Sequence, residues 1–257
     1  MVDLEPLSPR PLGQTGLHTA KLSLGTVKLG RDKGVKYPNT FKIPDDREAR
    51  TLLDTARALG INLLDTAPAY GSSEERLGQL IDNRADWLIC TKVGESFDGE
   101  VSHHDFSPEA CRTSVERSLI RLDTDVLDIV LIHSDGNDEE ILNQLGTLEA
   151  LQQLKAEGKI RAVGISHKSV VGAELAIARG ADVIMATLNP DYLDDQKVIA
   201  QADAQGCGVM IKKAFSSGHG RAEDLAFVAA QPGVHTIVIG TTNPDHLTEN
   251  VRQVSES

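Results

Sequence analysis

Short apolar runs alternate with longer segments of helical periodicity from about Lys21 onward. Eight runs rich in Val, Ile and Leu recur along the chain: LSLG, INLLD, WLICTK, LDIVLIH, IRAVGIS, DVIMATLN, GVMIK and HTIVIG. Apolar residues at successive positions suit strands buried on both faces, which is typical of a parallel sheet rather than an antiparallel sheet with one face in water. The pattern therefore predicts eight parallel strands.

Helix signals fill the segments between these runs. Ser107 and Pro108 are typical of an N-cap and a first helical residue, and apolar residues then recur every three or four positions over 111–122. A second apolar face extends over 145–154 and ends at Gly158, just before IRAVGIS. Helix followed by strand is thus the expected repeating unit.

The spacing of the units favours a closed barrel. The part of the chain from Lys21 onward allows about 30 residues for each run, which is enough for one strand and one crossover helix. We therefore predict an α/β fold, a (β/α)8 TIM barrel, with residues 1–257 forming a single domain. An open doubly wound sheet is the alternative, but no strand leads into a G-x-G-x-x-G turn. RPLGQTGLHTA predicts an N-terminal β-hairpin, and RDKGVKYPNTFKIPDD predicts a polar loop after the first strand.

Charge and cysteine usage narrow the functional classes. The 257 residues include 26 Lys+Arg and 38 Asp+Glu, a net charge of −12, which argues against a nucleic-acid partner and against an anionic membrane surface. Neither a secretory signal nor an apolar stretch of about 18 residues is present. Cys90, Cys111 and Cys207 lack disulfide or metal-site spacing and suggest reduced thiols in a cytoplasmic protein. The sequence does not indicate an oligomeric state.

Catalytic side chains of such barrels project from the C-terminal ends of the strands. Polar residues stand at these positions in three neighbouring runs. Asp65 and Tyr70 follow the second run, Lys92 ends the third and His133 ends the fourth. A carboxylate keeps a nearby ammonium charged, and the ammonium lowers the pKa of a nearby tyrosine from about 10. A neutral imidazole can hydrogen-bond a carbonyl oxygen. The set suits protonation of the alkoxide formed when hydride reaches an aldehyde or ketone.

Each of these residues taken alone is more often structural than catalytic, so the hypothesis depends on their occurring together at one edge. An enzyme of another barrel type, with Lys92 or Lys212 as a Schiff-base nucleophile, is an alternative. His103, His104 and Asp105 do not form a ligand set, because adjacent residues on a strand point to opposite faces. We therefore predict a solvated loop there and no metal site.

Several blocks of the sequence resemble the aldo-keto reductases. LDTAPAYGSSEERLGQLI, WLICTKVGE, LDIVLIHSD and GISHK are similar to blocks of that family, RPLGQTGLHTAKLSLGT is similar to its opening hairpin and first strand, and IGTTNPDHLTEN extends the match. The resemblance implies an enzyme that reduces a small-molecule aldehyde or ketone with NADPH, with NADH possible. It implies that Tyr70 is the general acid, that Lys92 and Asp65 tune it, and that His133 orients the substrate carbonyl.

The resemblance also implies a cofactor site at the ends of the first, fifth, seventh and eighth strands. Its residues would be Thr26, Ser166, His167, Lys212, Phe215, Ser216, Gly218, Gly240, Thr241, Thr242, His246, Glu249 and Asn250.

Departures from the family pattern concern both ends of the dinucleotide. Gly240 and His246 stand where relatives that grip a 2′-phosphate place Lys and Arg, so we expect weaker discrimination between NADPH and NADH. His167 replaces the usual Asn after Ser166, Met185 replaces a Gln, and Lys212 replaces an aromatic residue. These changes keep open a non-catalytic barrel of the same family that senses or regulates through bound nucleotide. The loops over 37–46 and 95–106 are the expected walls of the substrate pocket, and the substrate itself is not indicated.

Overall fold

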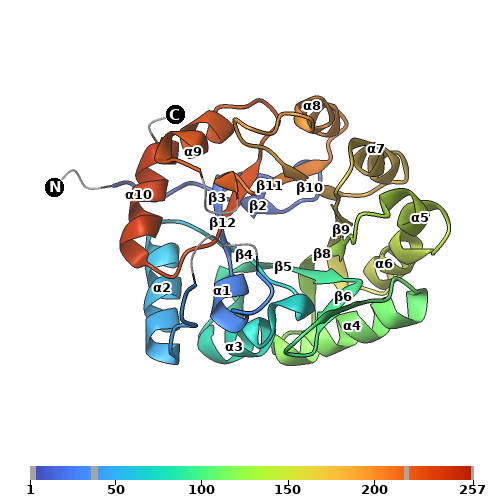
Figure 1. Ribbon diagram of the computed structural model, residues 1–257, viewed down its shortest axis with the longest axis horizontal. Coiled ribbons are helices and arrows are strands. Elements are labelled where there is room, and N and C mark those ends of the chain that lie inside the picture. Colours follow the sequence, from blue (N-terminus) through green and yellow to red (C-terminus); the bar gives the residue numbers. More distant parts are fainter. Residues whose placement is uncertain (1–3, 36–39, 217–219, 256–257) are drawn as a thin grey trace.

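Eight parallel strands close into a barrel in the computed structural model, which describes residues 4–35, 40–216 and 220–255 (Figure 1). The strands follow one another around the barrel in chain order, and the last pairs with the first. They are β3 (Leu22–Gly25), β4 (Leu63–Asp65), β5 (Leu88–Val93), β8 (Leu127–His133), β9 (Ile160–Ser166), β10 (Val183–Thr187), β11 (Gly208–Lys212) and β12 (Thr236–Ile239). Each strand coincides with one of the eight apolar runs, with β5 extending one residue beyond its run to Val93, so the predicted TIM barrel is confirmed.

Helices surround the barrel on the outside (Figure 1). They are α1 (Val27–Gly30), α2 (Asp46–Ala58), α3 (Ser73–Leu80), α4 (Pro108–Arg121), α5 (Asp138–Asn143), α6 (Thr147–Ala156), α7 (Val170–Ala178), α8 (Gln196–Ala204), α9 (Ala222–Ala229) and α10 (Pro244–Ser255), with the short 3-10 helices η1 (Pro68–Tyr70) and η2 (Arg84–Asp86). The Ser107 hydroxyl caps α4 as predicted and accepts from Ala110 N at 3.3 Å. The second predicted helix begins later than expected: Gly146 has φ 70°, a left-handed conformation that separates α5 from α6 and leaves Leu145 outside both.

The predicted N-terminal hairpin closes the N-terminal end of the barrel. Strands β1 (Arg10–Pro11) and β2 (His18–Thr19) pair antiparallel. Leu12 and Leu17, in the turn between them, are fully buried against the side chains that fill the barrel interior. The interior is therefore packed with apolar side chains, and a larger apolar core lies between the strands and the helices. This packing fixes the positions of the strand ends at the opposite mouth.

A second hairpin stands where a solvated loop was expected. Strands β6 (Glu95–Phe97) and β7 (Ser102–His104) pair antiparallel directly after β5. Gly94 makes the turn between β5 and β6 with φ 96°, and a Cβ there would collide with the ring of Phe106. The sequence prediction was wrong here because backbone pairing between two short polar segments leaves no apolar periodicity. The hairpin brings Glu95 to the barrel mouth.

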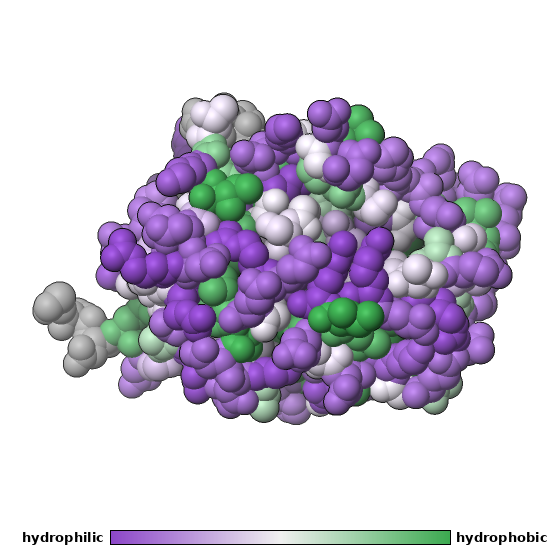
Figure 2. All heavy atoms as spheres, turned by 90° about the horizontal axis from the view of Figure 1, so that it is seen from below, coloured by the Kyte–Doolittle hydropathy of each residue, from purple (hydrophilic) through white to green (hydrophobic). Residues whose placement is uncertain are grey.

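The face drawn in Figure 2 is mainly hydrophilic. Figure 2 shows hydrophobic side chains as small, separate groups on one face. The large exposed hydrophobic side chains lie on separate segments of the chain: Val101, Ile120, Val171 and Leu193. Among the described residues, no helix combines the length and the apolar character that crossing a membrane requires.

Candidate active site

Tyr70 reaches the mouth of the barrel on a tightly packed turn. It ends η1, five residues after the last residue of β4. Gly71 follows with φ 60°, and its backbone lies so close to Gly30 at the end of α1 that a Cβ on either residue would collide with the other segment. The hydroxyls of Thr26, Thr66 and Ser73 hydrogen-bond to one another beneath this turn. The turn is therefore held by sterics and buried hydrogen bonds.

Lys92 and Asp65 form a buried ion pair behind Tyr70. Lys92 is 1% exposed and Asp65 is 4% exposed. Lys92 Nζ donates to Asp65 Oδ1 at 2.6 Å and to the Thr66 carbonyl at 2.9 Å, and it lies 4.9 Å from the centre of the Tyr70 ring. Burial lowers the pKa of Lys92, but the charges of Asp65 and Tyr70 outweigh burial and leave that pKa well above its ordinary value. The ammonium is therefore charged at neutral pH.

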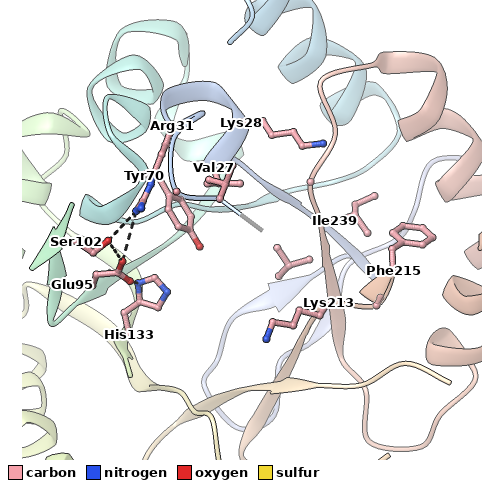
Figure 3. Close-up of a pocket in the computed structure, with 15 residues that line it drawn as sticks. Val27, Lys28, Arg31, Tyr70, Glu95, Ser102, His133, Lys213, Phe215 and Ile239 are labelled. Atoms are coloured by element: carbon pink, nitrogen blue, oxygen red, sulfur yellow. Dashed lines mark hydrogen bonds and ion pairs between the residues drawn. The ribbon is translucent and has the colours of Figure 1, made fainter. Parts of the chain in front are cut away.

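His133 faces Tyr70 across the same mouth. The two rings meet edge to face with centroids 6.1 Å apart. His133 Nδ1 lies 2.8 Å from Glu95 Oε2, and Figure 3 shows the ring between Glu95 and the cavity. Burial lowers the pKa of His133 from its ordinary value, while Glu95 opposes that shift. The imidazole is therefore mainly neutral at neutral pH.

Glu95 belongs to a polar network that the sequence analysis missed. The Ser102 hydroxyl donates to Glu95 Oε1 at 2.6 Å, and Arg31 Nη1 lies 3.7 Å from the same oxygen. Arg31 also donates to the Ala69 carbonyl, next to Tyr70, at 2.8 Å, and its guanidinium stacks over the Phe97 ring. Burial raises the pKa of Glu95, but the contacts with His133 and Ser102 outweigh it and lower the pKa to about 2. A carboxylate three residues after Lys92 was the available signal in the sequence.

A cavity of about 440 Å³ lies at the C-terminal mouth of the barrel, lined in part by Tyr70, His133 and Glu95. Figure 3 shows the hydroxyl of Tyr70 and the ring of His133 at one end and Phe215 at the other. The lining residues are Val27, Lys28, Arg31, Gly34, Val35, Tyr70, Glu95, Ser102, His133, Lys213, Ala214, Phe215, Val238, Ile239 and Gly240. A proton donor, a hydrogen-bonding ring and two ammonium groups therefore surround one space. Such an arrangement can bind a carbonyl group beside an anionic ligand.

Lys212 spans the opposite side of the mouth. Its Nζ donates to Ser166 Oγ at 2.9 Å and to the His167 carbonyl at 2.6 Å, which joins the end of β11 to the end of β9. Burial lowers the pKa of Lys212 to about 7, and Lys213 adds to that shift. His167 is buried beneath it, and burial lowers the pKa of His167 to about 4.

Comparison with known proteins identifies the family of the chain. Residues 21–223 match the model of the Aldo/keto reductase family. The chain belongs to that family. Its structure resembles the crystal structure of PA4992, a Pseudomonas aeruginosa protein assigned to the aldo-keto reductases, with 48% identity and a TM-score of 0.90 over 100% of this chain and 98% of that one.

Curated members of the family match only in part. The L-galactose dehydrogenase of Arabidopsis thaliana is 37% identical over 165 residues, 61% of this chain and 47% of that protein. The NADH-specific methylglyoxal reductase of Escherichia coli is 33% identical over 171 residues, 61% of this chain and 51% of that protein. The chain thus spans about half the length of these relatives.

The structure places the remaining expected cofactor residues of this aldo-keto reductase in different surroundings. Phe215 and Gly240 line the cavity beside Tyr70, whereas Thr26 is buried and its hydroxyl donates to the Asp65 carbonyl. Thr242 lines a second cavity of about 510 Å³ with Lys42 and Arg47. Ser216 follows Phe215 directly, Thr241 accepts from Asn243 N, and Gly218 lies outside the described residues. His246, Glu249 and Asn250 lie on α10, which begins at Pro244 as predicted.

No group of three or more His, Cys, Asp or Glu side chains in the described part of the chain is arranged to hold a metal ion. His103 instead faces Asp98 on the β6–β7 hairpin, with 2.8 Å between Nε2 and Oδ2.

Proposed function

We propose that this aldo-keto reductase reduces an aldehyde or ketone to an alcohol with a nicotinamide dinucleotide, and that residues 1–257 act as one catalytic domain. The observation that carries the proposal is the convergence of Tyr70 and His133 on one cavity, with the charged Lys92–Asp65 pair directly behind Tyr70. These groups come from three neighbouring strand ends and from the turn after β4. Their residue types and their positions fit general acid catalysis at a carbonyl oxygen.

The lining of the cavity fits the proposed cofactor. Lys28 and Lys213 supply positive charge for the phosphates, and Val27, Val238 and Ile239 supply apolar surface for a ring. Bound NAD(P)H would supply the hydride. The remaining work falls to side chains of the chain itself: Tyr70 donates a proton to the carbonyl oxygen, and the Lys92 ammonium stabilises the negative charge left on the phenolic oxygen.

We propose NADP as the dinucleotide, with NAD also accepted. Gly240 contributes no side chain for a 2′-phosphate, and His246 is exposed on α10. Lys42 and Arg47 face Thr242 across the second cavity and are the cations that line it. Flexible, exposed cations hold a phosphate less firmly than the fixed Lys and Arg of the family pattern, so the preference for NADPH is expected to be modest.

Turnover distinguishes this proposal from a regulatory barrel. We expect the purified protein to oxidise NADPH over many cycles when it is given a panel of aldehydes, ketones and quinones, and to oxidise NADH in the same assay. The absorbance of the reduced dinucleotide is the measurement. A protein that binds NADPH yet oxidises no more than a stoichiometric amount with every carbonyl compound would instead be a nucleotide sensor. The observation that favours this alternative is that Ser166, one of the expected cofactor residues, already accepts a hydrogen bond from Lys212.

Glu95 decides which nitrogen of His133 carries the proton in the neutral ring. A carboxylate beside Nδ1 places the proton there, and Nε2 is left without one. His133 therefore donates from Nε2 to a carbonyl oxygen only as the imidazolium. We propose that the protonated ring, in place of the neutral imidazole expected from the sequence, is the active form and that Glu95 is a positioning residue that stabilises it.

Replacing Glu95 by glutamine tests this role. Glu95 raises the pKa of His133, so removal of the Glu95 carboxylate lowers that pKa. The pH at which kcat/KM begins to fall as His133 loses its proton should therefore move to a lower value. At about pH 6 the rate of reduction is expected to fall roughly tenfold, which corresponds to a shift of about one pKa unit. The measurement is the pH profile of kcat/KM.

Asp98→Asn is the matched control, because Asp98 pairs with His103 on the same hairpin and does not contact His133. We expect its profile to equal that of the wild type. A Glu95→Gln profile that is lowered equally at every pH would contradict the positioning role and indicate a merely structural one.

A further inference from the structure

Lys212 places an amine in the barrel mouth that has no direct carboxylate partner in its hydrogen bonds. It is the last residue of β11, and its Nζ donates to the neutral oxygens of Ser166 and His167. Asp65 accepts from Lys92 in the comparable position on the other side of the barrel. The two lysines therefore differ: Lys92 is neutralised by a bonded carboxylate, and Lys212 is not.

Charged and titratable groups surround Lys212 from several elements. The cations and imidazoles that interact electrostatically with Lys212 are Lys213 on the same segment, Lys92 on β5, His133 on β8 and His167 after β9. The opposing carboxylates are Asp195 and Asp138. Both carboxylates have other partners: Asp195 accepts from Thr187 N at 2.8 Å, and Asp138 accepts from the backbone and hydroxyl of Ser169 at 2.7 and 2.6 Å. The amine therefore lies in a mouth that already holds positive charge.

We propose that Lys212 makes the site discriminate between the two redox states of the cofactor. The ammonium form of Lys212 weakens the binding of the oxidised dinucleotide and has little effect on the binding of the reduced dinucleotide. This inference rests on the proposed function and extends it to product release. Oxidised nicotinamide carries a positive charge, and reduced nicotinamide is neutral.

Geometry brings the two charges close together. A nicotinamide that delivers hydride to a carbonyl held by Tyr70 and His133 would lie at the strand ends. Lys212 ends β11 there, next to Lys213 in the cavity lining, and its charge helps to lower the pKa of His133. Like charges repel strongly in a partly buried site, where the effective dielectric constant is far below that of water. The oxidised dinucleotide therefore binds weakly to the ammonium form, or binds with loss of the Lys212 proton.

The proton dependence follows from linkage. Burial lowers the pKa of Lys212 to about 7, so the ammonium and amine forms are both present near neutral pH. Oxidised dinucleotide lowers this pKa further, because it disfavours the charged form. Its affinity therefore falls as the pH falls through about 7. The neutral nicotinamide of the reduced dinucleotide favours neither the ammonium nor the amine form of Lys212, so the affinity for the reduced dinucleotide changes less with pH.

The test compares dissociation constants of NADP⁺ and NADPH in the wild type and in Lys212→Met. The Kd ratio, oxidised over reduced, is expected to rise about fivefold from about pH 8.5 to about pH 6 in the wild type, which corresponds to a further lowering of the Lys212 pKa by about one unit. In Lys212→Met the ratio should stay flat. Both dinucleotides carry the same 2′-phosphate, so its titration and that of His246 cancel in the ratio.

Two further variants sharpen the comparison. Lys168→Met removes an exposed lysine two residues after Ser166 and should leave the ratio and its pH dependence as in the wild type. Lys213→Met removes a cation that lowers the pKa of Lys212, so the midpoint of the pH dependence should move to higher pH. His133 is retained in every variant, so its titration cannot account for a dependence that Lys212→Met abolishes.

Calorimetry supplies an independent readout. Below pH 7, binding of NADP⁺ should release more protons than binding of NADPH in the wild type, seen as a dependence of the binding heat on the buffer. This difference between the two dinucleotides should vanish in Lys212→Met. A flat ratio in the wild type, or the same slope in Lys212→Met, would overturn this inference and leave the proposed reductase activity intact. Absence of binding by both dinucleotides would overturn the inference and the proposed function together.

Discussion

Replacing Tyr70 by phenylalanine is expected to abolish most carbonyl reduction while the protein still binds the dinucleotide. The change removes the phenolic hydroxyl and keeps the ring that packs against His133. General acid catalysis contributes roughly 10²–10⁴-fold, so kcat should fall by that amount. Steady-state kinetics on a reactive aldehyde measures the loss, and the Kd for NADPH measures whether the cofactor site survives.

Tyr192→Phe provides the matched control. Tyr192 pairs with Asn189 after β10 and does not line the cavity, so removal of its hydroxyl should leave kcat unchanged. If Tyr70→Phe retained activity within about tenfold of the wild type, Tyr70 would not be the proton donor proposed here.

Lys92→Met is expected to reduce both activity and stability. It removes the ammonium beside the Tyr70 ring and leaves the buried Asp65 carboxylate without its ion-pair partner. Loss of one partner of a buried pair costs about 3–5 kcal/mol of unfolding free energy, which corresponds to a fall in Tm of roughly 10 °C for a chain of this size. Thermal unfolding and aldehyde kinetics on the same preparation measure the two effects.

The double variant Asp65→Asn/Lys92→Met separates these effects. It removes both buried charges, so we expect part of the lost stability to return while activity stays low. Recovery of activity together with stability would mean that Lys92 supports the fold and does not assist Tyr70. An unchanged Tm in Lys92→Met would show that Asp65 finds another partner.

The barrel could be predicted from the sequence because its strands are buried on both faces. Runs such as LDIVLIH have no polar alternation, and each is followed by a helix with an apolar face, so few folds other than a parallel barrel fit. Asp65 and His133 end their strands as expected, and Ser107 caps α4. Local signals of this kind depend on residues near one another in the chain.

Predictions that depended on weak local signals were less accurate. The β6–β7 hairpin was expected to be a loop, because its strands are only three residues long and mostly polar. Leu145 was assigned to a helix from the leucine spacing, but Gly146 separates it from α6. In both cases backbone geometry, which the apolar pattern does not report, determined the outcome.

Sequence alone determined the order of the elements, the edge at which the polar strand ends meet and the residue types at that edge. Only the tertiary structure decided which of these side chains touch. Glu95 reaches His133 because the hairpin after β5 folds back over the mouth, and Lys212 reaches Ser166 because β9, β10 and β11 lie side by side. The distance between side chains on different strands is fixed by barrel closure and strand register, and these depend on packing of the whole core rather than on neighbouring residues.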